Sequence, residues 1–356
     1  GRSVHRYGTK VSRAVSNSRS KLQHFLNAES ANEVVFTRNA THSLNQVAHG
    51  LSWSKGDVVL TTDREHNSNL VPWLQLEQEQ GIDHRVVASN ADNTFDMEAF
   101  EKSCADAGSR LKLVSMSHVG NLDGVKIPLK EISKVAHDHG ALVCVDGAQS
   151  TPHMNVDVQD LDIDFLAFSV HKMCGPSGMG GLWGRYDLLD GLRTIQAGGQ
   201  TVENATYDSI KWASPPGRFE GGLGNFSGMI ATGAAVDYLS NIDLNEVNKH
   251  EIRLNQIMTD GIKDLPGIEI IGPLDARKRG GICSVLMGDI PVHDIAILLD
   301  EAAGVMVRSG QHCVHSWFNS RGHPNGSLRA SAYLYNTEEE ARLFVDIFSE
   351  AVHAFS

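Results

Sequence analysis

Lys172 is the first residue whose type and position suggest chemistry. It stands in the run Ser169-Val-His-Lys-Met-Cys-Gly-Pro-Ser-Gly178, directly after a short apolar stretch. A lysine at the end of a strand can act as a nucleophile or a base when its surroundings keep the amine neutral. A Ser-x-His-Lys run alone is equally compatible with a solvated loop, so the interpretation depends on partners elsewhere in the chain.

Asp146 and Gln149 are such partners. Asp146 ends the apolar run Val143-Cys-Val-Asp146, and Gln149 follows in the next turn. A carboxylate in this position can keep the ring nitrogen of a bound pyridine protonated, which makes the ring an electron sink, and the amide can donate to a ring oxygen. The three residues together indicate a site for a heteroaromatic cofactor.

Cys313 is the candidate nucleophile of the C-terminal third. It lies in Arg308-Ser-Gly-Gln-His-Cys313, a polar stretch that argues against a buried structural thiol. Arg308 and His312 could both favour the thiolate, which is the reactive form. Cys144, by contrast, stands between two valines in an apolar run and is expected to be a core thiol.

The cysteines and histidines do not predict a metal site. The chain has five cysteines and no CxxC pair. The histidines around Cys313 match no standard zinc spacing. The odd number and wide spread of the cysteines favour a reducing compartment, and we expect a cytoplasmic protein without a bound metal.

The elements that must position these residues follow an alternating pattern from residue 33 to about 184. Short β-branched stretches predict strands at 33–37, 57–61, 84–88, 111–117, 141–146, 165–169 and 179–183. Helical periodicity predicts helices at 43–49, 68–80, 97–107 and 129–139. This pattern is typical of an α/β fold with a mostly parallel seven-stranded sheet, in which ligands bind beyond the carboxyl ends of the strands.

A loop rich in Gly and Pro at 214–225 leads into a helix near 227–239, and a new pattern begins after Asn241. We therefore predict a large domain over 1–240, starting with a helix at 4–26, and a small α+β domain over 241–356 that carries the Cys313 loop. Within 241–356 we expect strands at 268–271, 281–287, 305–308 and 327–335, with helices at 291–302 and from 337. The basic, serine-rich first 28 residues also read as a transit peptide, but their apolar residues recur at helical spacing.

The net charge and the hydrophobic pattern limit the kinds of partner that the chain can bind. The 31 basic and 43 acidic side chains give a net charge of −12, which repels nucleic acid phosphates. No apolar run approaches the roughly 18 residues that a membrane helix needs. We expect neither nucleic acid nor a membrane as a partner.

With these motifs in this order, the sequence resembles the class V aminotransferase superfamily, and within it the group II, SufS-type cysteine desulfurases and selenocysteine lyases. The similarity covers nearly the whole chain. The segments that carry it are Glu65-His-Asn-Ser-Asn-Leu-Val-Pro-Trp73, His118-Val-Gly-Asn121, Val145-Asp-Gly-Ala-Gln149, Ser169 to Gly178, Arg218-Phe-Glu220, Arg308-Ser-Gly-Gln-His-Cys313 and Arg329-Ala-Ser-Ala-Tyr-Leu-Tyr-Asn-Thr337.

The resemblance implies the PLP-dependent transferase fold of type I, with pyridoxal 5'-phosphate as cofactor. It implies catalytic roles for Lys172, Cys313 and His66, with Lys172 bonded to the cofactor and His66 stacked on its ring. The implied cofactor-binding residues are Thr41, His66, Asp146, Gln149, Ser169, His171 and Lys172. The implied substrate-binding residues are Asn121, Arg308 and Arg329.

The implied reaction converts L-cysteine to L-alanine and leaves the sulfur as a persulfide on Cys313. The resemblance further implies a homodimer and a sulfur-acceptor protein of iron–sulfur cluster assembly. Two alternatives stay open: a selenocysteine lyase or another class V lyase or aminotransferase, and a non-catalytic scaffold on the same fold.

The chain departs from the family at two hydroxyl positions. Ala40 stands before Thr41, and Leu223 stands where relatives carry a threonine that reaches the partner subunit's cofactor phosphate. Neither side chain can donate a hydrogen bond, so we predict weakened cofactor retention. Relatives also carry a further segment ahead of the position of Gly1, which in the family starts the fold and lines the active site.

Overall fold

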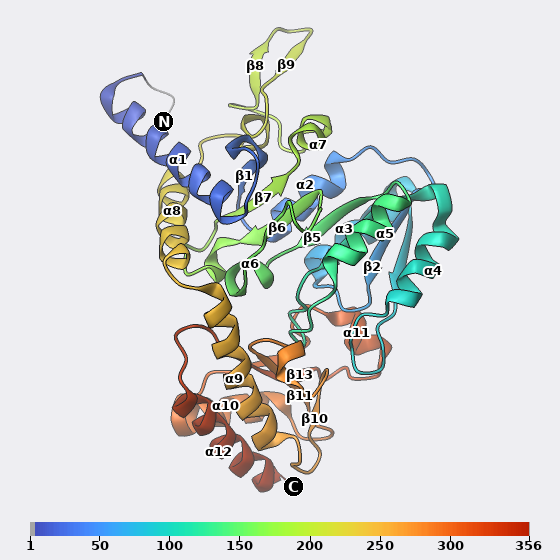
Figure 1. Cartoon of the computed structure of the whole chain (residues 1–356), viewed down its shortest axis with the longest axis vertical. Helices are drawn as coiled ribbons and strands as arrows, with labels where there is room; N and C mark the ends of the chain where they lie inside the picture. The colour runs from blue at the N-terminus through green and yellow to red at the C-terminus, as the bar shows by residue number, and fades with distance from the viewer. Residues whose placement is uncertain (1–3, 356) are drawn as a thin grey trace.

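The computed structural model describes residues 4–355 of the chain. Its centre is a seven-stranded sheet in the order β1-β7-β6-β5-β4-β2-β3 (Figure 1). The strand β7 is antiparallel to both of its neighbours, and the other pairs are parallel. The bounds are β1 Val34–Thr37, β2 Val58–Thr62, β3 Asp83–Val87, β4 Leu111–Ser117, β5 Leu142–Asp146, β6 Phe165–Ser169 and β7 Gly180–Gly184.

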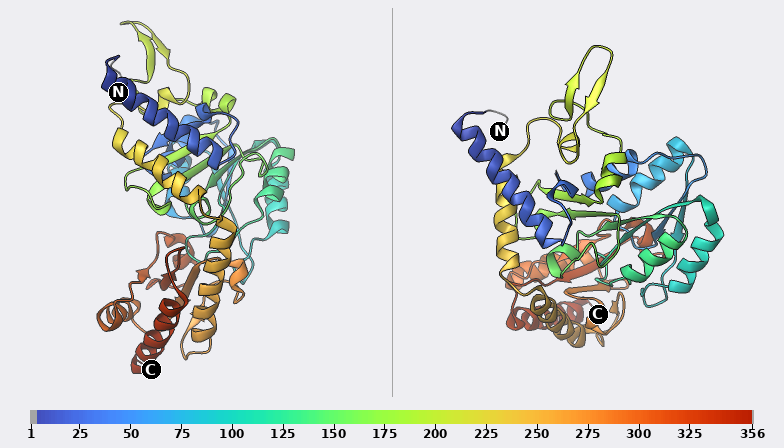
Figure 2. Two further views of the ribbon diagram at one scale, coloured as in Figure 1. Left: turned by 60° about the vertical axis from the view of Figure 1, so that its left-hand side comes forward. Right: turned by 45° about the horizontal axis from the view of Figure 1, so that its top comes forward.

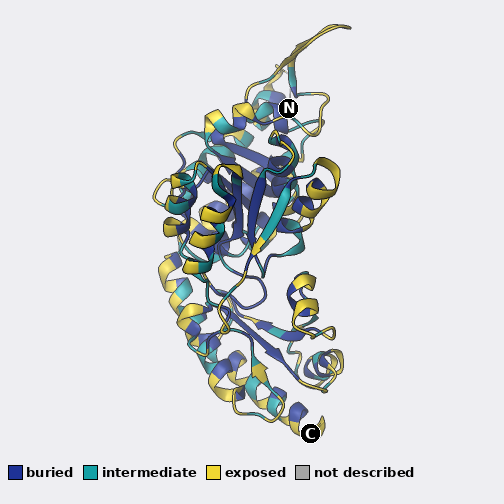
Figure 3. Cartoon of the chain, turned by 90° about the vertical axis from the view of Figure 1, so that its right-hand side faces the viewer, coloured by how far each residue is buried: buried dark blue, intermediate teal, exposed yellow. Residues whose placement is uncertain are grey.

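Helices cover both faces of this sheet. They are α1 Arg6–Phe25, α2 Ala40–Gly50, α3 Val71–Gln80, α4 Met97–Ala107, α5 Leu129–Asp138, α6 Ser150–His153, α7 Tyr186–Gly191 and α8 Phe226–Ser240. Successive strand residues point to opposite faces, so the sheet contributes to two cores. Val34 and Phe36 pack in the cluster that holds α1, α4, α5 and α8, whereas Val35 packs with α2, α3 and α7. Apart from the edge strand β3, which is mostly half-buried, the strands are buried between these layers (Figure 3).

The fold class predicted from the alternating pattern is confirmed. Every predicted strand of the large sheet is present, and each of its ends lies within one residue of the predicted position. The predicted helix at 43–49 begins earlier, at Ala40, because the Asn39 side chain caps it by accepting from the His42 N–H. The predicted helix at 68–80 begins later, at Val71, after a 3-10 turn over Asn67–Asn69.

A hairpin of β8 Val202–Ala205 and β9 Ile210–Trp212 was not predicted. It projects away from the body of the molecule (Figures 1 and 2). Its residues are mostly exposed, and Tyr207 at its tip is fully exposed. The short strands and weak alternation explain why the pattern gave no signal.

A second, four-stranded antiparallel sheet follows in the order β10-β11-β13-β12. Its elements are β10 Glu269–Ile270, β11 Ile282–Leu286, β12 Arg308–Gly310 and β13 Ser327–Ser331, with α9 Leu244–Ile262, α10 Val292–Ala303, α11 His315–Ser320 and α12 Glu338–Phe355. The chain passes between the two sheets at the break between α8 and α9 (Figure 2). We propose that the domain division lies there; residues 1–3 and 356 of the predicted domains lie outside the described part.

Two strand predictions in this second unit were wrong in their bounds. The strand predicted at 305–308 is Arg308–Gly310, because only these residues pair with Ser327–Arg329 of β13. The strand predicted at 327–335 ends at Ser331, because Asn336 then accepts from the Tyr333 N–H in a turn. In the described residues, no helix is long and apolar enough to cross a membrane.

Candidate active site

Lys172 closes a short 3-10 turn that follows β6, at the carboxyl ends of the parallel strands. It lines a cavity of about 180 Å³. Eight of the residues predicted from sequence line this one cavity: Thr41, His66, Asn121, Asp146, Gln149, Ser169, His171 and Lys172. The loops after β2, β4, β5 and β6 supply most of them, as the rule for parallel sheets leads one to expect.

The surroundings of Lys172 favour its neutral amine. Burial lowers the pKa of Lys172 below that of an ordinary lysine, and the positive charge of Arg329 acts in the same direction. The negative charges of Asp146 and Cys313 oppose this effect. A neutral amine can attack a carbonyl carbon or accept a proton, so Lys172 is placed for nucleophilic and base chemistry.

One end of the cavity is suited to an anion. The N-terminus of α2 opens into it through Asn39, Ala40 and Thr41. The Ser169 hydroxyl accepts from the Ala40 N–H at 3.0 Å, and the Thr41 and Ser68 hydroxyls lie 2.6 Å apart. A helix N-terminus with hydroxyl donors attracts a phosphate group.

A backbone hydrogen bond at one ring nitrogen orients the His66 side chain. Its Nδ1 accepts from the Ser68 N–H at 3.0 Å. Burial lowers the pKa of His66, and Lys172, Arg329 and Arg308 lower it further, while Asp146 acts in the opposite direction. The ring is therefore predominantly neutral and offers a flat, weakly polar surface beside Asp146.

Glu65, next to His66, is a buried carboxylate to which no role was assigned from sequence. It accepts from the Thr62 hydroxyl at 2.6 Å, from the Asn69 amide at 2.7 Å and from the Ser117 hydroxyl at 2.6 Å. Burial raises the pKa of Glu65, and these donors act against that rise. Glu65 thus joins the ends of β2 and β4 and fixes the turn that carries His66.

Arg329 is a half-buried cation with unused hydrogen-bonding capacity. Its Nη1 donates to the Asn121 carbonyl at 2.7 Å, but its buried Nε has no partner within residues 4–355. Arg308 stands opposite it across β12 and β13. Burial and the Arg308 charge lower the pKa of Arg329 to about 10. Two neighbouring arginines with free donors form a site for a carboxylate.

Asn121 is partly engaged in another interaction. Its Nδ2 donates to the His312 carbonyl at 2.8 Å, so the side chain contacts the Cys313 loop directly. The sequence predicted Asn121 as a binding residue for substrate but gave no indication of this link. Asn121 therefore connects the cavity with the Cys313 loop.

Cys313 is half-buried, as expected for a thiol that must react. It lies close enough to Lys172 and Arg329 to influence the pKa of each. The sequence suggested that Arg308 and His312 could both favour the thiolate, but His312 cannot do so as a cation. The His312 side chain is buried, and burial together with Arg329 and Arg308 lowers its pKa to about 3, so the ring is neutral.

The other thiols have different surroundings. Cys104, Cys144 and Cys283 are buried and Cys174 is exposed. Burial raises the pKa of Cys144 to about 12, which agrees with the core thiol predicted there. Within residues 4–355, no three His, Cys, Asp or Glu side chains are grouped to hold a metal ion.

A comparison with protein-family models decides the relationship of the chain. The model described as aminotransferase class V matches residues 1–344. The chain belongs to the class V aminotransferase family. The similarity extends over nearly all of its length, as the resemblance in the motifs predicted.

Curated class V relatives give the same result. A protein of Halalkalibacterium halodurans named a probable cysteine desulfurase is 39% identical over 346 residues, which are 95% of this chain and 82% of that one. A cysteine desulfurase of Haloferax volcanii is 36% identical over 359 residues, covering 100% of this chain and 83% of that one.

Solved structures show that the fold is shared. The apo cysteine desulfurase of Thermococcus onnurineus has a TM-score of 0.93 at 36% identity and covers 99% of this chain and 87% of that one. The cysteine desulfurase CsdA of Escherichia coli has a TM-score of 0.91 at 30% identity, with the same coverage. The type I fold implied by the sequence is thereby confirmed for this class V chain.

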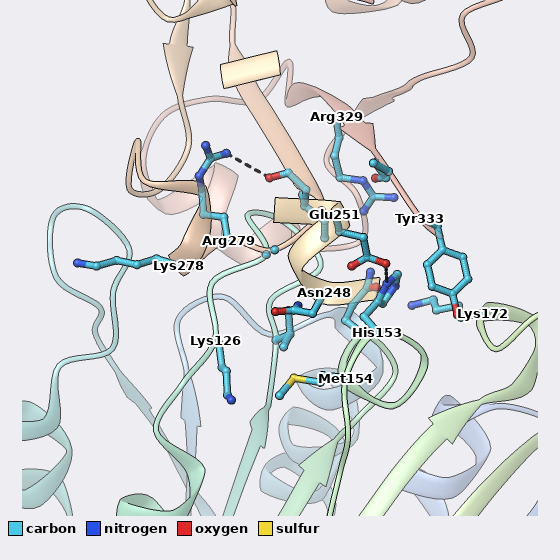
Figure 4. A pocket seen from close by; sticks show the side chains of 18 of the residues that line it. Lys126, His153, Met154, Lys172, Asn248, Glu251, Lys278, Arg279, Arg329 and Tyr333 are labelled. Carbon is cyan, nitrogen blue, oxygen red and sulfur yellow. Dashed lines mark hydrogen bonds and ion pairs between the residues drawn. The ribbon is translucent and has the colours of Figure 1, made fainter. Parts of the chain in front are cut away.

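A second cavity, of about 490 Å³, adjoins the first and shares Val119, Gln149, His171 and Lys172 with it. Figure 4 shows side chains that line this second cavity. Arg329 faces this cavity, and His153 Nδ1 lies 2.8 Å from a Glu251 oxygen on its wall. Burial raises the pKa of Glu251. Sequence reasoning missed this pair, because Glu251 comes from α9 in the second unit and only the fold brings it to His153.

Proposed function

We propose that the chain is a pyridoxal 5'-phosphate-dependent cysteine desulfurase. One observation carries the proposal: Lys172, Asp146 and the N-terminus of α2 line a single cavity, and Cys313 lies within electrostatic reach of Lys172. The cavity offers an amine, a carboxylate and an anion site, which are the groups that pyridoxal phosphate requires. The orphaned Nε of Arg329 supplies a donor for the carboxylate of an amino acid.

When bound, the cofactor withdraws electrons from the amino acid and so weakens the bonds at its Cα and Cβ. Lys172 holds the cofactor and moves the Cα proton, and Asp146 keeps the pyridine nitrogen protonated. Arg329 and Arg308 orient the carboxylate. The Cys313 thiolate attacks the substrate sulfur, an S–S bond forms as the Cβ–S bond breaks, and alanine leaves after Cβ is protonated.

A single-turnover experiment tests this proposal. The holoenzyme is treated with one equivalent of L-cysteine without reductant, and its peptides are analysed by mass spectrometry. We expect the Cys313 peptide to gain one sulfur atom while the Cys174 peptide, which carries the other accessible thiol, stays unchanged. Alanine formed without sulfur on Cys313 would favour another class V lyase, and no alanine would favour a non-catalytic scaffold.

Arg329 provides a specificity prediction. Replacing it with Gln removes a charged, forked donor, which is worth about 1.5–3 kcal/mol per hydrogen bond. We expect Arg329→Gln to lower kcat/KM for L-cysteine by about 10- to 100-fold. Steady-state alanine release measures this effect. The control is Arg342→Gln on α12, an equal loss of charge at an exposed site, which should leave KM unchanged.

Leu223 provides a prediction on cofactor retention. Its side chain is exposed and lines a surface hollow that also includes Thr37 and Arg38. If a hydroxyl at this position donates to the cofactor phosphate, Leu223→Thr should tighten pyridoxal phosphate binding by about 10-fold. Titration followed by the cofactor's visible absorbance measures the affinity. Leu223→Val has the shape of threonine without its hydroxyl, and equal affinity in both variants would contradict the prediction.

The active enzyme is a homodimer under this proposal. Tyr207, Ile210 and Leu223 are large apolar side chains exposed on and near the β8–β9 hairpin, which supports an interface on this side. Light scattering should give twice the mass of one chain, 38.7 kDa. We expect Ile210→Asp to shift the protein towards the monomer, and an unchanged mass would place the interface elsewhere.

The sulfur on Cys313 goes to an acceptor protein, and we propose iron–sulfur cluster assembly in the cytoplasm as its use. The half-buried Cys313 supports direct transfer to a second protein, because the thiol is accessible without unfolding. The five cysteines are free, which suits a reducing compartment.

A further inference from the structure

Cys313 lies in a backbone conformation that costs free energy. Its φ is 61° and that of the preceding His312 is 49°, which places two successive non-glycine residues in the left-handed region. Such residues persist only when surrounding contacts hold them. The contacts that hold this pair therefore determine where the thiol points.

His312 is at the centre of these contacts. Its Nε2 lies 2.9 Å from the buried Ser327 hydroxyl on β13, and its carbonyl accepts from the Asn121 side chain at 2.8 Å. Arg329, two residues after Ser327 on the same strand, donates to the Asn121 carbonyl at 2.7 Å. Three hydrogen bonds and the backbone of β13 thus join Ser327, His312, Asn121 and Arg329, a set of residues that we call the circuit.

A second tether holds the other side of the loop. The Cys313 carbonyl accepts from the Asn67 N–H at 2.7 Å, and Asn67 Nδ2 lies 2.9 Å from His315 Nδ1. Asn67 directly follows His66, which faces the cofactor cavity. The thiol is therefore fixed relative to both the carboxylate site and the ring-facing histidine.

We infer that His312 is a positioning residue, which acts through Ser327 and Asn121 to aim the Cys313 thiol at the substrate sulfur. This inference rests on the proposed function. The His312 side chain is buried, and its ring lies against Phe318, with 6.2 Å between the ring centroids. A neutral imidazole in this position accepts or donates one hydrogen bond and does not exchange protons with the thiol during turnover.

The circuit also couples substrate binding to the thiol. Arg329, which we propose to bind the substrate carboxylate, donates a hydrogen bond to the Asn121 carbonyl. The Asn121 side chain in turn donates a hydrogen bond to the His312 carbonyl. An amino acid that engages Arg329 therefore also stabilises the His312–Cys313 turn. A substrate without a carboxylate should form persulfide slowly for this reason, in addition to binding weakly.

Two substitutions of His312 separate positioning from acid–base catalysis. Glutamine places an amide near the position of Nε2 and can keep the contact with Ser327, but it cannot act as an acid or base. Alanine removes the contact. The rate of persulfide formation in a single turnover is measured for each holoenzyme, together with exchange of the substrate's Cα proton with deuterated solvent, which precedes attack by the thiol.

We expect His312→Ala to slow persulfide formation by about 10-fold or more and His312→Gln by about threefold or less. Proton exchange should stay within about twofold in both variants, because Lys172 is not disturbed. Ser327→Ala removes only one hydroxyl and should slow persulfide formation by about two- to tenfold without unfolding the protein.

Three outcomes would overturn the inference. Glutamine as damaging as alanine would mean that the imidazole's proton chemistry matters. Persulfide formation unchanged in His312→Ala and Ser327→Ala would mean that the circuit does not position the thiol. A fall in the rate of proton exchange as large as the fall in the rate of persulfide formation would indicate general disruption of the site. Failure of the unsubstituted chain to form persulfide would instead refute the proposed function.

Discussion

Replacing Lys172 with alanine should lower alanine release from L-cysteine by about 10²- to 10⁴-fold, the range expected when a proton-transfer group is lost. Lys172 is the amine that lines the cofactor cavity beside Asp146. Under our proposal, removing it takes away both the covalent hold on the cofactor and the base for the Cα proton. Steady-state turnover with saturating pyridoxal phosphate measures the effect, and reduction with borohydride should no longer attach the cofactor to the protein.

A matched lysine substitution provides the control. Lys126 lines the second cavity but not the first, and its exposed side chain can be shortened by the same substitution. We expect Lys126→Ala to retain turnover within about twofold. The lowered pKa of Lys172 adds a pH criterion, because the amine is neutral at a lower pH than that of an ordinary lysine. Activity should therefore level off at a pH below the ordinary pKa of a lysine. Retained turnover in Lys172→Ala would refute the assignment.

Cys313→Ala should have the second largest effect. Without the thiol no persulfide can form, and we expect sulfide release in the presence of reductant to fall by about 10²-fold or more. Exchange of the Cα proton should continue, because Lys172 and Asp146 remain in place. This split between the two steps distinguishes loss of the nucleophile from loss of the cofactor site.

Cys174→Ala is the control for this substitution. Cys174 is the exposed thiol two residues after Lys172, and it lines the second cavity. It should be dispensable, because no group that we assign to the reaction contacts it. Full sulfide release from Cys313→Ala, with L-selenocysteine turned over equally well, would favour the lyase alternative.

Much of the site could be predicted from the sequence, because residues at the carboxyl ends of parallel strands lie near one another in the fold. Asp146 ends β5, and Lys172 closes the short turn that follows β6. The carboxyl ends of parallel strands meet at one edge, so the proximity of these two residues could be predicted without a structure. The N-terminus of α2 was predictable for the same reason. Cys313 required the resemblance as well, because its loop comes from the second unit.

The parts that could not be predicted depend on contacts between distant segments. The burial of His312 results from Ser327 and Phe318, and a polar sequence around it suggested exposure instead. The pairing of His153 with Glu251 depends on how α9 lies against the large sheet. The β8–β9 hairpin is exposed, so hydrophobic periodicity gave no signal for it.

The most direct test of the central claim measures the two products of L-cysteine together. The chain is supplied with pyridoxal 5'-phosphate and a thiol reductant, and alanine and sulfide are quantified over time. Our account predicts that both appear in equal amounts and that neither accumulates when cysteine is replaced by serine, which has no sulfur for Cys313 to attack. Alanine without sulfide, or pyruvate in place of alanine, would contradict a cysteine desulfurase.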